Sequence, residues 1–137
     1  MQLAALDTLR LVRTDLHEGE HGDWWRVELD GAGAKTGELV GFVQFVRETR
    51  EVGFGVLASY RGRGFAHRAL ALLIDELAPA SGRLEFVAFT RRDNAAAQAV
   101  LRTNGFRLAD GPRGDADPSW LRLARSVGPH ESAPGPD

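Results

Sequence analysis

The stretch VLASYRGRGFA at residues 56–66 connects an apolar, strand-like run to an apolar, helix-like run. Gly62 and Gly64 allow the backbone to approach a ligand closely, and the guanidinium groups of Arg61 and Arg63 suit phosphate oxygens. The first backbone N–H groups of a helix lack intrahelical partners and lie at the positive end of the helix dipole. The stretch therefore predicts an anion-binding loop. A turn with two solvated arginines is the alternative interpretation.

Hydrophobic periodicity places this loop between a hairpin and a helix. Residues 39–47 and 51–57 are rich in β-branched and aromatic side chains, so we expect them to pair as a hairpin. The apolar positions in residues 65–78 recur at helical spacing, and a proline and a glycine follow them. Residues 84–89 are almost wholly apolar, as in a strand that is covered on both faces.

The rest of the chain adds further strands and a second helix. Residues 9–12 and 24–29 read as strands, and residues 95–103 as a helix that Asp93 or Asn94 caps. Its expected apolar side consists of Ala96, Ala97, Val100 and Leu101.

Two short strands are expected at residues 106–108 and 120–124, and the polar residues after them read as a tail. The sequence therefore predicts an α/β fold with a mixed sheet, as one domain over residues 1–125 with a flexible C-terminal tail at 126–137.

Composition limits the class of protein. The chain has 137 residues, of which 43% are hydrophobic and 26% charged, so we expect one globular domain. Its net charge of −2 argues against a nucleic-acid-binding protein, and no apolar stretch is long enough to cross a membrane. The chain contains no cysteine and begins without a signal-like segment, so a soluble, cytoplasmic protein is expected.

Two motifs in order resemble the GNAT superfamily of N-acetyltransferases. RGRGFA at residues 61–66 matches the family signature Arg/Gln-x-x-Gly-x-Gly/Ala, and Asn94 followed by NGF at residues 104–106 resembles its second motif. The resemblance covers residues 39–108. It implies a GNAT-like mixed, mostly antiparallel sheet flanked by helices, with a shortened N-terminal helical region.

The resemblance implies acetyl-CoA as co-substrate and no metal. Phe54 and Val56 would pair with the pantetheine arm through their backbone, and Asn94 would hydrogen-bond the same arm. Asn94 is equally suited to capping a helix. The coenzyme pyrophosphate would lie at Arg61, Gly62, Arg63, Gly64, Phe65 and Ala66.

The implied reaction is acetyl transfer to a primary amine by direct attack. Glu51 is the candidate base, acting through a water, although a solvated edge glutamate is the plainer interpretation. His67 is a second group that could move a proton. Leu101 stands where many relatives carry the tyrosine that protonates the leaving thiolate, and Tyr60 is expected to be a packing residue.

The N-terminal part departs from the family pattern. Residues 14–23 leave room for at most one very short helix, where relatives have two helices that form a wall of the acceptor site. The acceptor groove would then be open, or completed by a second subunit in a homodimer. Trp24, Trp25 and Trp120 are either core residues or part of an exposed apolar patch.

Other interpretations stay open. A non-catalytic acyl-CoA-binding or interaction domain fits the missing tyrosine, and Arg91 and Arg92 permit a weaker NADP-binding reading. One short segment contains metal-ligand residue types, but we expect it to be a solvated loop. These residues are His17, Glu18, Glu20 and His21.

Overall fold

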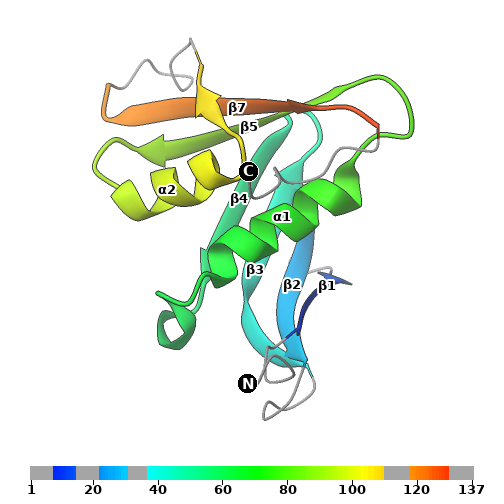
Figure 1. The fold of residues 1–137 in the computed structure, drawn as a ribbon, viewed down its shortest axis with the longest axis vertical. Coiled ribbons are helices and arrows are strands. Elements are labelled where there is room, and N and C mark those ends of the chain that lie inside the picture. The colour runs from blue at the N-terminus through cyan, green and yellow to red at the C-terminus, as the bar shows by residue number, and fades with distance from the viewer. Residues whose placement is uncertain (1–7, 15–21, 31–36, 110–117, 130–137) are drawn as a thin grey trace, which may run out of the picture.

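The computed structural model describes residues 8–14, 22–30, 37–109 and 118–129. Two α-helices, α1 (Phe65–Leu77) and α2 (Ala95–Thr103), and a single 3-10 turn, η2 (Ala58–Tyr60), occur in these ranges (Figure 1). The strands are β1 (Thr8–Thr14), β2 (Asp23–Asp30), β3 (Glu38–Val46), β4 (Glu51–Val56), β5 (Leu84–Arg91), β6 (Arg107–Leu108) and β7 (Trp120–Val127).

The strands form one mixed sheet in the order β1-β2-β3-β4-β5-β7-β6. Every neighbouring pair is antiparallel except β4 and β5, which are parallel because α1 connects them as a crossover. The predicted order of strands and helices, and the mixed, mostly antiparallel sheet, are confirmed. Within the described ranges, neither helix has the length and apolarity that a membrane crossing requires.

The last strand corrects the predicted start of the tail. β7 continues through Ser126 to Val127, and the side chain of Val127 is fully buried. Arg83 binds Ser126 through two hydrogen bonds, to Oγ at 2.9 Å and to the carbonyl oxygen at 3.0 Å. A tail beginning at Ser126 is therefore wrong for its first two residues. Residues 130–137 lie outside the described ranges, as do residues 15–21, where we expected at most a short helix.

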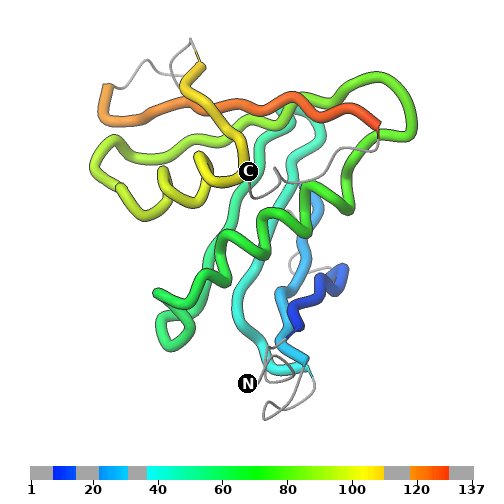
Figure 2. The backbone as a smooth tube through the Cα atoms, viewed as in Figure 1, coloured from blue at the N-terminus to red at the C-terminus, as the bar shows by residue number. Residues whose placement is uncertain are grey.

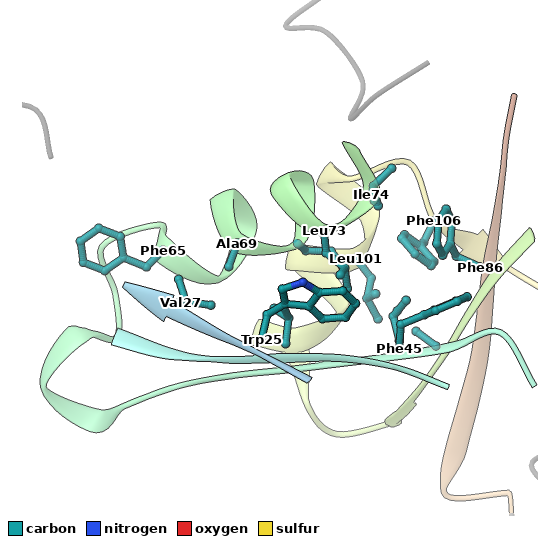
Figure 3. Close-up of a cluster of buried hydrophobic side chains, with 14 of the residues drawn as sticks. Trp25, Val27, Phe45, Phe65, Ala69, Leu73, Ile74, Phe86, Leu101 and Phe106 are labelled. Carbon is teal, nitrogen blue, oxygen red and sulfur yellow. The ribbon is translucent and has the colours of Figure 1, made fainter. Parts of the chain in front are cut away.

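Both helices pack on the same face of the sheet and share one core (Figures 1 and 3). The core face of β2 and β3 contributes Trp25, which lies beneath Leu73 of α1 in Figure 3, and Phe45, whose ring centroid is 5.7 Å from that of Phe86. Trp25 is thus a core residue, whereas Trp24 and Trp120 are half-buried. The largest side chains that are fully buried are Phe86, Phe106, Leu70, Leu73, Ile74, Leu101 and Leu123.

The apolar faces of the helices differ in part from the expected ones. In α1, Ala69 is buried and Ala66 is only half-buried, because the helix turns its Phe65–Ala69–Leu73 side toward the sheet. In α2, only Leu101 of the predicted apolar side is buried. The rest of that side borders a cavity described below.

Alternate residues of β2, β3 and β4 point away from both helices. The register pairs Trp24 with Gln44 and Gln44 with Gly53, and it pairs Arg26 with Phe42 and Phe42 with Gly55. Because side chains alternate across a strand, these residues share the outer face of the sheet. Neither of the two described helices covers that face (Figure 1).

Candidate functional site

The parallel strands β4 and β5 separate soon after they meet. Glu51 and Val87 are their registered pair, where the Val87 N–H donates to the Arg50 carbonyl oxygen at 2.9 Å. Figure 2 shows that β2, β3 and β4 run along the long axis while β5 and β7 cross it steeply. The two halves of the sheet therefore diverge from Glu51 toward Val56 and open a cleft.

The edge of β4 that borders this cleft carries backbone groups of Phe54 and Val56. The Leu57 N–H donates to the Val40 carbonyl oxygen of β3 at 2.8 Å, which fixes the alternation along the strand. By that alternation, Gly55 directs its backbone groups toward β3, and Phe54 and Val56 direct theirs toward β5. The structure thus places the two predicted pantetheine-binding residues with their N–H and C=O groups facing the cleft.

The glycine–arginine loop wraps the N-terminus of α1. Gly62 and Gly64 have φ values of 79° and 80°, a left-handed conformation that glycine adopts without strain. Gly64 caps the helix without a side-chain hydrogen bond, and the first helical bond joins the Arg68 N–H to the Gly64 carbonyl oxygen at 3.2 Å. The amides at the start of α1 consequently have no intrahelical acceptor.

The two predicted arginines are exposed, and each contacts the protein locally. Arg61 donates through Nε to the Val56 carbonyl oxygen at 3.0 Å, which ties the loop to the end of β4. Arg63 lies over the ring of Tyr60, 5.6 Å from its centroid. Tyr60 also contacts Phe65, with ring centroids 5.9 Å apart, so it is the packing residue that we expected.

Charges along α1 oppose its dipole. The first turn contains no acidic residue and the last turn no basic one. Instead Arg68 lies in the first turn, and Asp75 and Glu76 lie near the end. Each such arrangement costs about 0.3–1 kcal/mol at an exposed helix end. A bound anion at the N-terminus would offset the part of this cost that Arg68 contributes.

A cavity of about 670 Å³, the donor cavity, connects these features. It lies between the loop, the end of β4 and α2, and Asn94 borders both this cavity and the cleft. The Asn94 Oδ1 accepts a hydrogen bond from the Ala97 N–H at 3.0 Å, so its capping role is confirmed. The residues that line the donor cavity are Phe54, Gly55, Val56, Tyr60, Arg61, Gly62, Gly64, Phe65, Ala66, His67, Asn94, Ala96, Ala97, Ala99 and Val100.

The inter-strand cleft itself encloses about 330 Å³ between β4 and β5. Leu101, at the position of the expected tyrosine, is 1% exposed and borders the cleft. Thr90 is 5% exposed and supplies the only hydroxyl among the residues that line the cleft. Sequence reasoning missed Thr90, because nothing in the pattern of an apolar strand shows which side chain faces a gap between strands.

A third hollow, about 420 Å³ in volume, lies on the outer face of the sheet. We call it the outer hollow, and its lining residues are Trp24, Phe42, Gln44, Gly53, Phe54 and Gly55. The half-buried Glu51 lies two residues before Gly53 on β4, and therefore on the same face of the strand as Gly53 and Gly55. Glu51 lines none of these three hollows.

His67 joins the two helices beside the donor cavity. Its Nδ1 lies 3.0 Å from the Thr103 Oγ1 and 3.1 Å from the Asn104 Nδ2, both at the end of α2. Asn104 is fully buried, and its Nδ2 also donates to the His67 carbonyl oxygen at 3.2 Å. His67 therefore holds the first turn of α1 against α2.

The remaining predicted groups have local partners or lie outside the described residues. Arg92 donates to the Pro118 carbonyl oxygen at 3.0 Å. Arg91 lies 3.6 Å from an Asp93 carboxylate oxygen and 5.6 Å from the ring centroid of Trp120. The segment with His17 and His21 is outside the described ranges. Within those ranges, no three His, Asp or Glu side chains gather as a metal site would require.

A model of the family described as Acetyltransferase (GNAT) domain matches residues 4–107. The chain belongs to the GNAT family. The motifs at residues 61–66 and 104–106 both fall within the matched segment, as do the donor cavity and the inter-strand cleft except for Trp120. No curated protein matches the chain.

Solved structures show that this GNAT chain has the expected fold. An acetyltransferase from Agrobacterium tumefaciens str. C58 is 23% identical, with a TM-score of 0.60 over 76% of this chain and 60% of its own. The ribosomal-protein-S18-alanine N-acetyltransferase from Escherichia coli is 21% identical, with a TM-score of 0.60 over 88% and 76%.

PseH, an N-acetyltransferase from Campylobacter jejuni solved with acetyl coenzyme A, is 15% identical to the chain. Its TM-score is 0.58 over 80% of this chain and 70% of its own. The chain spans less than two thirds of the A. tumefaciens protein.

Proposed function

We propose that the protein transfers the acetyl group of acetyl-CoA to a primary amine. One observation carries the proposal. In a chain of the GNAT family, the partnerless amides at the N-terminus of α1 open into a cavity that continues along the free edge of β4.

The residues present fit the coenzyme. The left-handed Gly62 and Gly64 leave open space where a side chain would otherwise stand, since a Cβ on either meets no atom within 4 Å. The pyrophosphate would bind the amides of the loop and of the first turn of α1, with Arg61 and Arg63 beside it. Phe54 and Val56 would hold the pantetheine arm by their backbone groups.

The reaction would form one bond and break another. The amine nitrogen attacks the thioester carbonyl carbon, so a C–N bond forms and the C–S bond breaks. The nitrogen loses a proton, and the departing thiolate gains one. Glu51 would accept the first proton through a water, because it lies on the same face of β4 as Gly53, which borders the cleft. With Leu101 at the usual position of the acid, solvent would supply the second proton.

A second candidate is an acyl-CoA-binding domain without turnover. The absence of a tyrosine, histidine or carboxylate among the residues that line the inter-strand cleft favours it. The two candidates share the donor cavity and differ in whether free coenzyme A is released.

Membership of the GNAT family does not identify the amine that accepts the acetyl group. The E. coli relative is named for a ribosomal protein alanine, so a polypeptide N-terminus belongs to the acceptors that this fold accommodates, beside small amines. A cytoplasmic location and a homodimer stay predictions.

Calorimetry with acetyl-CoA and two glycine variants tests the binding site. Gly64→Val should weaken acetyl-CoA binding at least roughly tenfold, because the side chain would occupy the space of the phosphates. Gly82→Val is the matched control, since Gly82 is also left-handed (φ 72°) with open space around it but lies beyond the C-terminus of α1. Equal binding by both variants would refute the donor site.

Release of free coenzyme A thiol tests turnover. Glu51→Gln should lower kcat by about 10²-fold or more while leaving acetyl-CoA binding unchanged, because only proton removal is lost. Glu48→Gln, in the adjacent exposed turn, should retain full activity. Tight acetyl-CoA binding without turnover on any amine would favour the non-catalytic candidate.

A further inference from the structure

The outer hollow and the donor cavity lie on opposite faces of the same strand. The donor cavity is bounded by both helices, whereas the outer hollow opens on the face that no described helix covers. Phe54 and Gly55 border both spaces, and Gly53 borders the outer hollow and the inter-strand cleft. Molecules bound in the two spaces would therefore meet at residues 53–55.

Glycine at position 55 is not required by the fold. A Cβ on Gly55 meets no atom within 4 Å, and its φ is outside the left-handed range. Gly41, across the same strand pair, is required, because a Cβ there would collide with the Gly55 carbonyl oxygen. A glycine that weakens a strand without a structural need marks a place where a ligand approaches the backbone.

The chemistry of the outer hollow selects its ligand. Trp24 and Phe42 provide aromatic surface, Gln44 provides an amide, and no lining residue is charged. Aromatic rings bind apolar groups, and their faces attract an amine in its cationic form.

The charged groups nearest on this face already pair with one another, and Arg10 also lies 3.7 Å from an Asp30 carboxylate oxygen. Glu28 lies 3.2 Å from an Arg10 nitrogen and 3.2 Å from the Arg26 Nε, and its side chain is only 9% exposed. A ligand with several positive charges would find Glu51 as its one uncommitted carboxylate on this face of β4. The outer hollow therefore suits a ligand that carries a single amine and is otherwise apolar.

The backbone around the outer hollow does not favour a polypeptide. β2 pairs with β3, and β3 pairs with β4, throughout the segments that line it. The β4 edge at Phe54 is the one strand edge there that β2–β3 and β3–β4 pairing leaves open, and in the proposed function the pantetheine arm takes its main-chain hydrogen bonds, so none remain for an extended peptide. Recognition would depend on side-chain contacts with a compact ligand.

On the basis of the proposed function, we propose that the outer hollow binds the acceptor, a small primary amine on an aromatic or branched apolar body without a second charge. The amine reaches residues 53–55 from the outer face and forms the C–N bond as the C–S bond breaks. The bound ammonium first passes one proton through water to Glu51, which frees the lone pair for attack. The nitrogen loses its second proton to solvent as the thioester breaks, and the departing thiolate takes a proton from solvent.

Steady-state kinetics with three acceptors tests the choice of ligand. For the full chain, kcat/KM with 2-phenylethylamine should exceed that with spermidine, and that with an Ala-Ala-Ala peptide amide, at least roughly tenfold. Preference for spermidine or for the peptide would overturn the proposal, in favour of a polycation or of a protein terminus.

Variants of the lining residues test the location. Trp24→Ala and Phe42→Ala should each raise KM for 2-phenylethylamine roughly tenfold, with the Kd for acetyl-CoA within twofold of the parent. Val12→Ala is the control, because Val12 pairs with Arg26 on the outer face but does not line the outer hollow. If Phe42→Ala does not fold, Phe42→Leu replaces it in the same KM measurement, because leucine keeps an apolar side chain but removes the aromatic ring.

The outcomes separate the two proposals. Unchanged KM values in an enzyme that turns over 2-phenylethylamine would overturn the acceptor site and leave the proposed function standing. A parent protein that neither binds acetyl-CoA nor releases thiol with any amine would overturn both.

Discussion

The two faces of strands β2, β3 and β4 carry similar residue types with different consequences. On the core face, Trp25 and Phe45 are 4% and 2% exposed and pack beneath α1. On the outer face, their neighbours Trp24 and Gln44 are half-buried around an open hollow. Trp24 and Trp25 are thus neighbours in the sequence with different surroundings, since Trp25 stabilises the core and Trp24 borders the hollow that we propose as the acceptor site.

The largest difference between the faces is expected for two phenylalanines of β3. Phe45→Ala should lower the free energy of unfolding by about 3–5 kcal/mol, because it leaves a cavity against Phe86 in a core that does not relax fully. Phe42→Ala should lower it by about 1 kcal/mol, because this ring is partly in solvent already. Urea unfolding followed by tryptophan fluorescence measures both, and equal losses would remove the distinction between the faces.

A glycine pair sharpens the comparison. Gly41→Ala should destabilise the protein by about 2–3 kcal/mol, because its Cβ meets the backbone of Gly55 and the strands must move apart. Gly55→Ala should change stability by less than about 1 kcal/mol, in either direction. Thermal unfolding of the two variants side by side tests this, and a Gly55→Ala loss equal to that of Gly41→Ala would contradict it.

A smaller effect is expected at α2, where one residue has both a structural and a ligand-facing role. Asn94→Ala should cost about 1 kcal/mol, because the Ala97 N–H loses its acceptor. Asn94→Asp keeps that acceptor and should retain stability, yet it places a carboxylate beside the donor cavity and should weaken acetyl-CoA binding. Calorimetry combined with thermal unfolding separates the two effects, and parallel changes would show that Asn94 serves only as a cap.

Local signals in the sequence predicted most of the fold. Helical periodicity located α1 to within one residue of its end, and Asn94, one of the two expected caps, begins α2. The start of the tail was misplaced, because Ser126 and the glycine and prolines after it resemble a loop, while Val127 owes its place in the sheet to pairing with Leu84. Pairing over such a distance leaves no local trace.

The residues alone predicted the candidate site only where it is continuous in the sequence, and the family resemblance added Phe54, Val56 and Asn94. The loop at residues 61–66 is one segment, so its glycines and arginines could be recognised together. The outer hollow combines residues of three strands, and its composition depends on the register between them. Ala96, Ala97 and Val100 could not be distinguished from core, because an apolar helix face looks the same whether a sheet or a ligand covers it.

Because the charges at the ends of α1 oppose its dipole, the stability of the folded protein should depend on whether a coenzyme is bound. A dianion at Gly64 would bond the open amides and also offset the unfavourable position of Arg68 near the positive end of the helix dipole. Coenzyme that binds only the native state, at about a hundred times its Kd, would raise the free energy of unfolding by about 2.7 kcal/mol. With acetyl-CoA bound as proposed, the cellular lifetime of this protein should follow the abundance of acetyl-CoA, and depletion should expose the chain to proteolysis.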